Sequence, residues 1–293
     1  MKKILLSPNP YRDHDFAVAC EAAKILEEHN LETVCCLPFH PGNVEIPSAP
    51  LRFSDLDKEI DSADLIICFG GDGTILHMAK TAAMRNKPIL GINLGSVGFM
   101  ADLEVRELPL LARLSTGEYV TEKRMMLDVG VLRGDRCIYR EQALNDAVLT
   151  KGAVARVLNF AVSSDDVEMM RFRGDGIIVS APTGSTAYAM SAGGPIIEPT
   201  ARNILVTPIC AHSISVRSFV LNSKSRVNIH PIGINNKAVY LSVDGGRAFR
   251  LYAADQIEIV RSNLETTLVR IRNRSFYETI SRKLGENRKD EEQ

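Results

Sequence analysis

The stretch ADLIICFGGDGTILHMAKTAAM, residues 63–84, passes from an apolar run through three glycines and one aspartate into a pattern with helical spacing. Asp64–Phe69 is typical of a strand that is covered on both faces. The apolar residues after the glycines recur on one helical face, at Ile75, Met78, Ala79, Ala82 and Ala83. Pro88–Ile92 is the next predicted strand. This order predicts a βαβ unit, and therefore a parallel sheet with helices on its faces.

The same alternation extends over about the first 110 residues. Lys3–Ser7 and Leu31–Leu37 are predicted strands, and Phe16–Leu26 carries helical spacing between them. From Met125 onward, short runs of β-type composition dominate, separated by turn signals. Among these runs are Leu127–Leu132, Cys137–Tyr139, Val239–Val243, Ala248–Leu251, Gln256–Val260 and Thr267–Ile271.

Three segments are therefore expected. Residues 1–119 form an α/β domain with a Rossmann-like parallel sheet, and residues 120–271 form a β-rich, sandwich-like domain. Residues 272–293 begin with a helix, Phe276–Leu284, that ends at Gly285. The charged tail after this helix has almost nothing to bury and is predicted to be frayed.

Composition narrows the class of protein. The chain has 293 residues and a formal net charge of -1, so electrostatics gives no reason to expect nucleic acid or an anionic membrane as a partner. No run approaches the ~20 apolar residues of a membrane-spanning helix. Six cysteines occur without a CxxC pair, so structural zinc is not expected, and a reducing cytoplasm fits their use. We therefore expect a cytoplasmic protein without nucleic-acid or membrane partners.

The glycines around Asp72 have two interpretations. A helix that begins at Gly73 or Thr74 directs unpaired N–H groups and a partial positive charge at the turn, which favours an anion such as phosphate. A carboxylate beside phosphates is repelled unless chemistry requires it, so Asp72 is a candidate base or a group near Mg²⁺. The alternative is a glycine-rich turn in which Asp72 caps the helix.

A second glycine-rich loop, Asn93–Phe99, directly follows the next predicted strand. Ligands of open α/β sheets bind at the carboxyl ends of the strands, so the two loops together predict one phosphate-binding crevice. Taken alone, this second loop is better explained as a flexible connector.

A third segment, Arg173–Pro195, is dense in small residues and hydroxyl groups around Tyr188. Such a surface suits a nucleoside, because small residues admit a flat base and an aromatic ring can stack on it. A Ser/Gly-rich linker is the alternative. The pair Asn145-Asp146 interrupts a predicted strand and is more often a bulge or turn than a base- or ribose-binding pair.

Together these segments resemble the bacterial type of the ATP-dependent NAD kinase family. The matching elements are Gly70–Thr74, Asn93–Phe99, Glu122–Leu127, Asn145-Asp146, Arg173–Pro195, His212-Ser213 with Arg217, Ser242–Gly245 and Lys283–Gly285. The GGDGT motif alone is weak evidence, because diacylglycerol kinases, sphingosine kinases and phosphofructokinases carry a similar one. The ordered set is much more specific and covers nearly the whole chain.

The resemblance implies transfer of a phosphoryl group from ATP, or from polyphosphate, to the 2′-hydroxyl of the adenosine ribose of NAD, giving NADP. It implies that Mg²⁺ accompanies ATP, that no residues form a dedicated metal site, and that the protein is a homodimer or homotetramer. Asp72 is implied as the general base on that hydroxyl. Implied NAD-binding residues are Gly73, Phe99, Asn145, Asp146, Asp175, Thr183, Ser185, Thr186, Ala187, Tyr188 and Asp244. Implied phosphate-binding residues are Gly71, Thr74, Asn93 and Gly95.

Asp146 departs from the family pattern, which commonly has glutamate there, so a direct hydrogen bond to the sugar could become water-mediated. The family also implies that the dinucleotide binds between the two domains and that the final helix returns to the first. Two other functions are kept as alternatives. One is a lipid or sugar kinase that shares the GGDGT motif, and the other is a catalytically silent dinucleotide-binding sensor.

Overall fold

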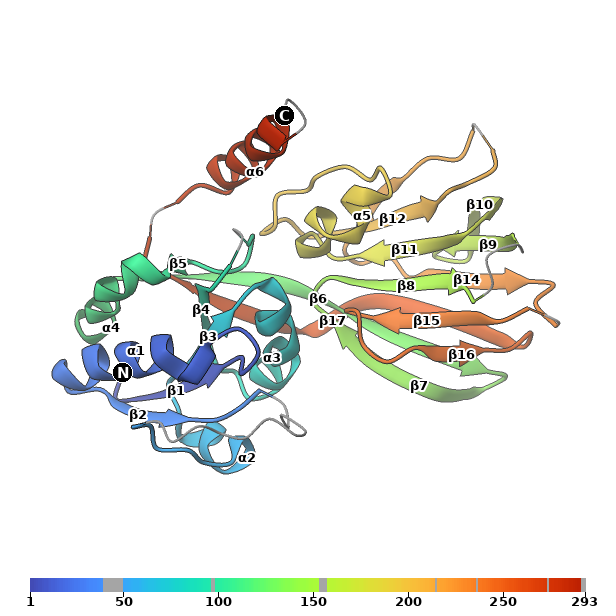
Figure 1. The fold of residues 1–293 in the computed structure, drawn as a ribbon. Coiled ribbons are helices and arrows are strands. Elements are labelled where there is room, and N and C mark those ends of the chain that lie inside the picture. Colours follow the sequence, from blue (N-terminus) through green and yellow to red (C-terminus); the bar gives the residue numbers. More distant parts are fainter. Residues whose placement is uncertain are drawn as a thin grey trace. The chain divides into compact units, whose positions relative to one another are not determined.

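The chain packs as two compact units in the computed structural model (Figure 1). Unit 1 comprises Met1–Lys123 and Thr266–Gln293, and unit 2 comprises Arg124–Glu265. The structure describes residues 1–38, 50–95, 98–152, 157–213, 215–235, 237–272 and 274–290. The predicted domain limits of 1–119, 120–271 and 272–293 stay predictions. Two strands, β6 (Val120–Arg133) and β17 (Asp255–Arg270), have residues in both units.

Unit 1 contains a parallel sheet with the strand order β2-β1-β3-β4. Its strands are β1 (Lys3–Pro8), β2 (Glu32–Cys35), β3 (Leu65–Gly70), β4 (Ile89–Asn93) and the short β5 (Leu103–Glu104) beside β4. β3 and β4 pair in parallel, and every residue of both strands is buried. The predicted parallel sheet and its βαβ unit are confirmed.

Unit 1 contains several helices, and two of them bury an apolar stripe that the sequence predicts. They are α1 (Ala17–Glu28), α2 (Leu56–Glu59), α3 (Asp72–Met84), α4 (Arg113–Thr116) and α6 (Phe276–Asp290), with 3₁₀ helices η1 (His14–Phe16), η2 (Ile60–Ser62) and η3 (Val105–Ala112). In α3 the buried residues include Ile75, Met78, Ala79, Ala82 and Ala83, which is the predicted stripe.

Unit 2 is an antiparallel β-sandwich. One sheet has the order β13-β12-β11-β8-β15-β16; the strands of the other include β10, β9, β14 and β17, with β6 beside β17 and β7 beside β6. The remaining bounds are β7 (Arg136–Ala143), β8 (Asp146–Lys151), β9 (Leu158–Ser164), β10 (Val167–Gly174), β11 (Gly176–Ser180), β12 (Asn203–Ile209), β13 (Phe219–Asn222), β14 (Val227–Ile232), β15 (Val239–Val243), β16 (Phe249–Leu251), η4 (Thr183–Thr186) and α5 (Tyr188–Ser191). Leu149 and Val179 of the first sheet share one buried cluster with Phe160 and Ile257 of the second. The expected fold class is confirmed.

Two predictions for the C-terminal part are wrong. Gln256–Val260 and Thr267–Ile271 were expected as separate strands, but β17 runs unbroken from Asp255 to Arg270. The final helix was expected to end at Gly285, but α6 continues to Asp290. One glycine inside a helix costs only about 1 kcal/mol relative to alanine, and the glutamate, arginine and lysine that follow it are good helix formers.

The six cysteines are all free thiols. Cys35, Cys36 and Cys68 are buried in unit 1, whereas Cys137 and Cys210 are exposed on unit 2. Within the described residues, no helix is both long and apolar enough to cross a membrane.

Candidate active site

Asp72 opens helix α3, and its carboxylate turns toward the second glycine-rich loop. The residue that caps the helix is Gly71. The Asp72 carboxylate accepts hydrogen bonds from the backbone N–H groups of Phe99 at 2.7 Å and Met100 at 3.0 Å. The alternative in which Asp72 caps its own helix is therefore wrong. Its side chain instead joins two loops that follow neighbouring parallel strands.

Gly98 lies directly against the Asp72 carboxylate, and this close approach requires a glycine. A Cβ atom at Gly98 would lie 2.1 Å from Oδ1 of Asp72, far inside van der Waals contact. A glycine at this position lets the second loop approach the carboxylate closely enough for both N–H bonds. Residues 96 and 97 of the predicted Asn93–Phe99 loop lie outside the described residues.

A cavity of about 210 Å³ lies at the carboxyl ends of β1, β3 and β4. Its lining residues are Gly70, Gly71, Gly73, Thr74, Asn93, Leu94, Gly95, Asn9 and Arg12. All four predicted phosphate-binding residues are in this set. Backbone N–H groups at the start of α3 and the helix dipole make the end of such a cavity favourable for an anion.

Asn9 and Arg12 were missed by sequence reasoning. The Asn9 amide donates a 3.1 Å hydrogen bond to Oγ1 of Thr74, so the loop after β1 is tied to the GGDGT turn. Arg12 is exposed and is the one cation among the lining residues of this cavity. The available signal was positional: the first predicted strand ends just before Asn9, at the same sheet edge as the two glycine loops.

In unit 2, Asp244 clamps the bend at Asn145-Asp146. The Asp244 carboxylate accepts hydrogen bonds from the N–H groups of Leu144 at 2.7 Å, Asn145 at 2.8 Å and Asp146 at 2.9 Å. The Asp244 N–H in turn donates to the Asp146 carbonyl at 2.9 Å. Asn145 thus lies in a bend between β7 and β8, which confirms the structural part of the sequence interpretation. Asp244 has a left-handed backbone, with φ of 50°, which aspartate tolerates better than most residues.

Asp146 and Asp244 are two neighbouring acids in a buried setting. Asp146 is 5% exposed, and burial, followed by the charge of Asp244, raises its pKa from 3.8 to about 7. Burial also raises the pKa of Asp244, although its three backbone N–H donors act in the opposite direction. Within the described residues, no donor is hydrogen-bonded to the Asp146 carboxyl group. Near neutral pH the Asp146 carboxyl can therefore either donate or accept a hydrogen bond.

The turn Thr183–Thr186 packs directly on this bend. A Cβ atom at Gly184 would lie 2.2 Å from the Asn145 carbonyl oxygen, and the Ala181 N–H donates to that oxygen at 2.9 Å. Ser185 is fully buried, and its hydroxyl group bonds the Pro182 carbonyl at 2.7 Å. Tyr188 is 44% exposed at the start of α5. The structure therefore brings together Asn145, Asp146, Asp244 and the predicted segment from Thr183 to Tyr188, with Thr186 and Ala187 partly exposed.

Asp175 lies at the other end of the same sheet. In β11, Gly176 pairs with Thr150 whereas Ser180 pairs with Asp146, so about 13 Å of strand separates the two positions at a rise near 3.3 Å per residue. Asp175 forms an ion pair with Lys151 at 2.5 Å. It belongs to a different part of unit 2 from Asn145, Asp146, Asp244 and the segment from Thr183 to Tyr188.

Comparison with known proteins decides the family. A model described as the ATP-NAD kinase N-terminal domain matches residues 16–119, and one described as the ATP-NAD kinase C-terminal domain matches residues 144–271. The NAD kinase of Natranaerobius thermophilus is 39% identical over 287 residues, which cover 97% of this chain and 98% of that one. The chain belongs to the NAD kinase family.

The NAD kinase resemblance read from the sequence is thereby confirmed, and the chain is an enzyme of this type. The NAD kinase of Caldanaerobacter subterraneus subsp. tengcongensis is 36% identical and covers 98% of this chain and 100% of its own. Yeast NADH kinase, solved as a complex with NADH, superposes with a TM-score of 0.81 at 26% identity, over 97% of this chain and 88% of that one. An Archaeoglobus fulgidus NAD kinase solved with ATP shares the fold, with a TM-score of 0.70 at 22% identity over 95% of this chain and 96% of that one.

The side chains near the two glycine-rich loops fit a magnesium ion that arrives with a nucleotide. Within the described residues, no group of three or more His, Cys, Asp or Glu side chains could hold a metal ion. Mg²⁺ commonly keeps several waters and is bound through one or two carboxylates together with substrate phosphates. Asp72, placed between two glycines of the phosphate-sized cavity, is a carboxylate of that kind.

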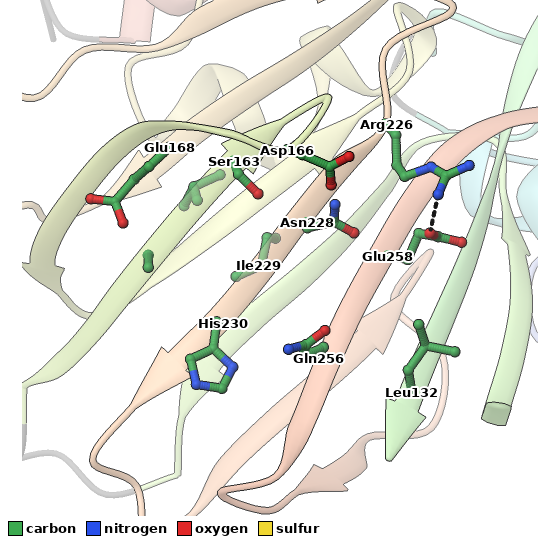
Figure 2. A pocket seen from close by; sticks show the side chains of 12 residues that line it. Leu132, Ser163, Asp166, Glu168, Arg226, Asn228, Ile229, His230, Gln256 and Glu258 are labelled. Carbon is green, nitrogen blue, oxygen red and sulfur yellow. Dashed lines mark ion pairs between the residues drawn. The ribbon is translucent and has the colours of Figure 1, made fainter. Parts of the chain in front are cut away.

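A larger cavity of about 380 Å³ lies in unit 2 (Figure 2). Polar side chains from β9, β14 and β17 line it, among them Ser163, Asn228, His230 and Gln256. Arg226 and Glu258, which also line it, form an ion pair with each other at 3.4 Å. It contains none of the predicted site residues and none of the glycine loops, so its size does not make it the catalytic site.

Proposed function

We propose that this enzyme transfers the γ-phosphoryl group of ATP to the 2′-hydroxyl of the adenosine ribose of NAD, with Asp72 as the general base. The observation that supports this most is the position of Asp72. Its carboxylate is fixed by two backbone N–H groups beside a cavity of about 210 Å³ that glycines, Asn93 and Arg12 line. The resemblance that named Asp72 as base agrees with this geometry.

Each part of the cavity has a distinct task in this reaction. The backbone N–H groups around Gly71 and Gly73 donate to phosphate oxygens, and the Arg12 guanidinium offsets their charge. Asp72 uses one lone pair of each oxygen on Phe99 and Met100, which leaves acceptor capacity for the proton of a ribose hydroxyl. An alcohol is a poor nucleophile at neutral pH, so a positioned carboxylate that takes its proton assists the transfer.

Mg²⁺ bound with the triphosphate would neutralise charge on the phosphoryl oxygens, and Asp72 is the residue whose carboxylate would hold it. Inorganic polyphosphate carries the same phosphoanhydride chemistry as ATP. It is therefore a second candidate donor for the same cavity.

Unit 2 supplies the binding surface for NAD in this proposal. Asn145 and Asp146 contact the adenosine ribose, and Thr183, Thr186, Ala187 and Tyr188 line the base. Asp244 and Ser185 contribute by holding this surface in shape, because their oxygens are used in internal hydrogen bonds. Asp175 takes the nicotinamide end, which fits its distance from Asp146 along β11. The yeast relative solved with NADH supports a dinucleotide as the ligand.

The test is an NADP-formation assay with NAD, ATP and Mg²⁺ on the purified chain and on Asp72→Asn. Wild type is expected to form NADP, and the variant to lose at least ~100-fold in rate while calorimetry shows unchanged NAD binding. Glu21→Gln, an exposed acid on α1, is the matched control and is expected to keep wild-type turnover.

Other outcomes point to the alternatives. NAD binding without turnover on ATP or polyphosphate would identify a silent sensor. Absence of both binding and turnover would favour a lipid or sugar kinase. Wild-type turnover in Asp72→Asn would remove Asp72 from the role of base.

We also propose that the enzyme is a homodimer or homotetramer. The family resemblance supports this, and light scattering coupled to size exclusion distinguishes both from a monomer of 32.3 kDa.

A further inference from the structure

The carboxylate of Asp72 is oriented by residues 98–100, and these residues are themselves held by the C-terminal part of the chain. Phe99 and Met100 each donate one N–H to a different oxygen of Asp72. Gly98 passes so close to the same carboxylate that no side chain fits there. Whatever fixes residues 98–100 therefore also fixes where the Asp72 oxygens point.

Arg270, at the end of β17, holds the carbonyl side of this segment. Its Nη1 donates to the Met100 carbonyl at 2.7 Å. Its Nε donates to Glu122 at 3.3 Å, and Asp102 lies 3.9 Å from Nη1. The Arg270 side chain is only 14% exposed, so the guanidinium is a restrained anchor.

Helix α6 packs on the Phe99 ring of residues 98–100. The Phe276 ring lies 6.3 Å from the Phe99 ring, centroid to centroid, in a tilted arrangement. The Lys283 ammonium group lies 4.1 Å from the centroid of the Phe99 ring, within the range of a cation–π interaction. These two contacts come from positions seven residues apart, so both lie on one face of α6.

Ion pairs and hydrogen bonds join α6, and the residues that lead to it, to the segment that directly follows Met100. Glu104 accepts a hydrogen bond from Arg282 of α6 at 3.2 Å and lies 3.7 Å from Arg274. Asp102 accepts the backbone N–H of Ile271 at 2.8 Å. The C-terminal segment is therefore anchored within a few residues of the loop that orients Asp72.

We propose that Phe276 and Lys283 are positioning residues for Asp72, which act through the ring of Phe99 although neither contacts the carboxylate. The catalytic consequence of this proposal rests on the proposed role of Asp72 as base. If the ring of Phe99 loses its cover, the Phe99 and Met100 amides gain freedom and the carboxylate loses its fixed direction. A misplacement of about 1 Å at a reacting group can lower the rate 100-fold.

The first test is independent of activity and measures amide hydrogen exchange at Phe99 and Met100 by NMR. Exchange is expected to be at least ~10-fold faster in Phe276→Ala than in wild type, because local opening becomes easier. Ser281→Ala, an exposed position on the same helix, is the control and should exchange like wild type. Unchanged protection in Phe276→Ala would overturn the proposal, and this result holds even if wild type forms no NADP.

The second test is a double-mutant cycle on turnover. Phe276→Ala is expected to lower kcat about 10-fold with little change in KM for ATP. Phe276→Tyr keeps the ring and should therefore keep most of the wild-type rate. Lys283→Met removes the ammonium group but keeps an aliphatic side chain, so kcat should fall about 3-fold. In the Asp72→Asn background the same substitutions should cost nothing further, because the group they position is gone.

A loss of equal size in both backgrounds would show that α6 matters only for the general fold and would overturn the proposal. Lys283→Met keeps most of the packing, so it decides the case if Phe276→Ala does not fold. NADP formation absent in wild type would instead refute the proposed function, and the exchange measurement would still decide whether α6 holds residues 98–100.

Discussion

The carboxylates of Asp72 and Asp244 are held in the same way but have different surroundings. Each precedes a glycine, and each accepts hydrogen bonds from consecutive backbone N–H groups of a segment distant in sequence. Asp72 accepts two and lies between glycines that line a cavity, whereas Asp244 accepts three and has a second buried acid, Asp146, as its neighbour. In the function proposed above, the same arrangement of hydrogen bonds would orient a base in unit 1 and shape the NAD-binding surface in unit 2.

The largest expected effect separates the two aspartates by activity. Asp72→Asn keeps the shape of the side chain but cannot act as a base, so kcat should fall at least ~100-fold. The free energy of unfolding should fall by about 1 to 2 kcal/mol, because the amide oxygen still accepts one N–H whereas the amide NH₂ group cannot accept the other. Urea unfolding together with the NADP assay checks both. A large loss of stability with retained turnover would make Asp72 the structural clamp of the pair.

Gly98→Ala tests the position of the same carboxylate by adding an atom next to it. The added Cβ would lie 2.1 Å from Oδ1 of Asp72, so the carboxylate or the loop has to move, and kcat should fall about 10-fold or more. Gly130→Ala in β6, where the nearest atom to the added Cβ is the Glu258 carbonyl oxygen at 3.9 Å, is the control. Equal turnover in both variants would mean that the position of the carboxylate is not critical.

Asp244→Asn tests the clamp in unit 2. Asparagine tolerates the left-handed backbone at this position but offers one acceptor oxygen where three N–H groups point. We expect a loss of about 2 kcal/mol in the free energy of unfolding and weaker NAD binding. Calorimetry with NAD measures the binding, and denaturant titration measures the stability. Stability equal to wild type would contradict the clamp.

Arg12→Ala tests the one cation among the described residues that line the cavity at the two glycine-rich loops. Without this cation, KM for ATP should rise about 10-fold, whereas kcat at saturating ATP changes little. Lys24→Ala removes an exposed charge from α1 and serves as the matched control. If the two variants have the same KM for ATP, Arg12 does not face the phosphates.

The smallest expected effect is a pH dependence in unit 2. Burial and the charge of Asp244 raise the pKa of Asp146 from 3.8 to about 7, so between these values the folded state keeps a proton that the unfolded state releases. This contribution is fully present below pH ~4 and is lost as pH rises through about 7, so the free energy of unfolding falls over that range. Asp146→Asn cannot ionise, so its free energy of unfolding should not fall over this range and should exceed that of wild type above pH 7.

Urea unfolding at pH 5, 6, 7 and 8 measures this difference. Asp135→Asn, at an exposed turn, is the control and should keep the wild-type slope. A slope unchanged in Asp146→Asn would show that this acid is ionised in the folded state.

The features that could be predicted well from the sequence are those that depend on neighbouring residues. The stripe of α3 and the apolar runs of β3 and β4 follow from spacing within a dozen residues, and so does the placement of the glycine loops at strand ends. What it missed depends on pairing between distant residues. Arg12 becomes part of the cavity only because β1 lies beside β3, and Asp244 becomes a clamp only because its turn meets residues 144–146. The unbroken β17 was missed because polar residues in its middle imitate a turn.

The distribution of thiols described above makes the two units chemically distinguishable. Burial raises the pKa of Cys68 to about 12, and burial likewise raises the pKa of Cys35 and Cys36. An alkylating reagent reacts with thiolates, so these three sulfurs stay inert until unit 1 opens. Once the partly exposed Cys20 and the exposed Cys137 and Cys210 have been blocked on the native protein, further labelling by a maleimide would measure the rate at which unit 1 opens, separately from unit 2.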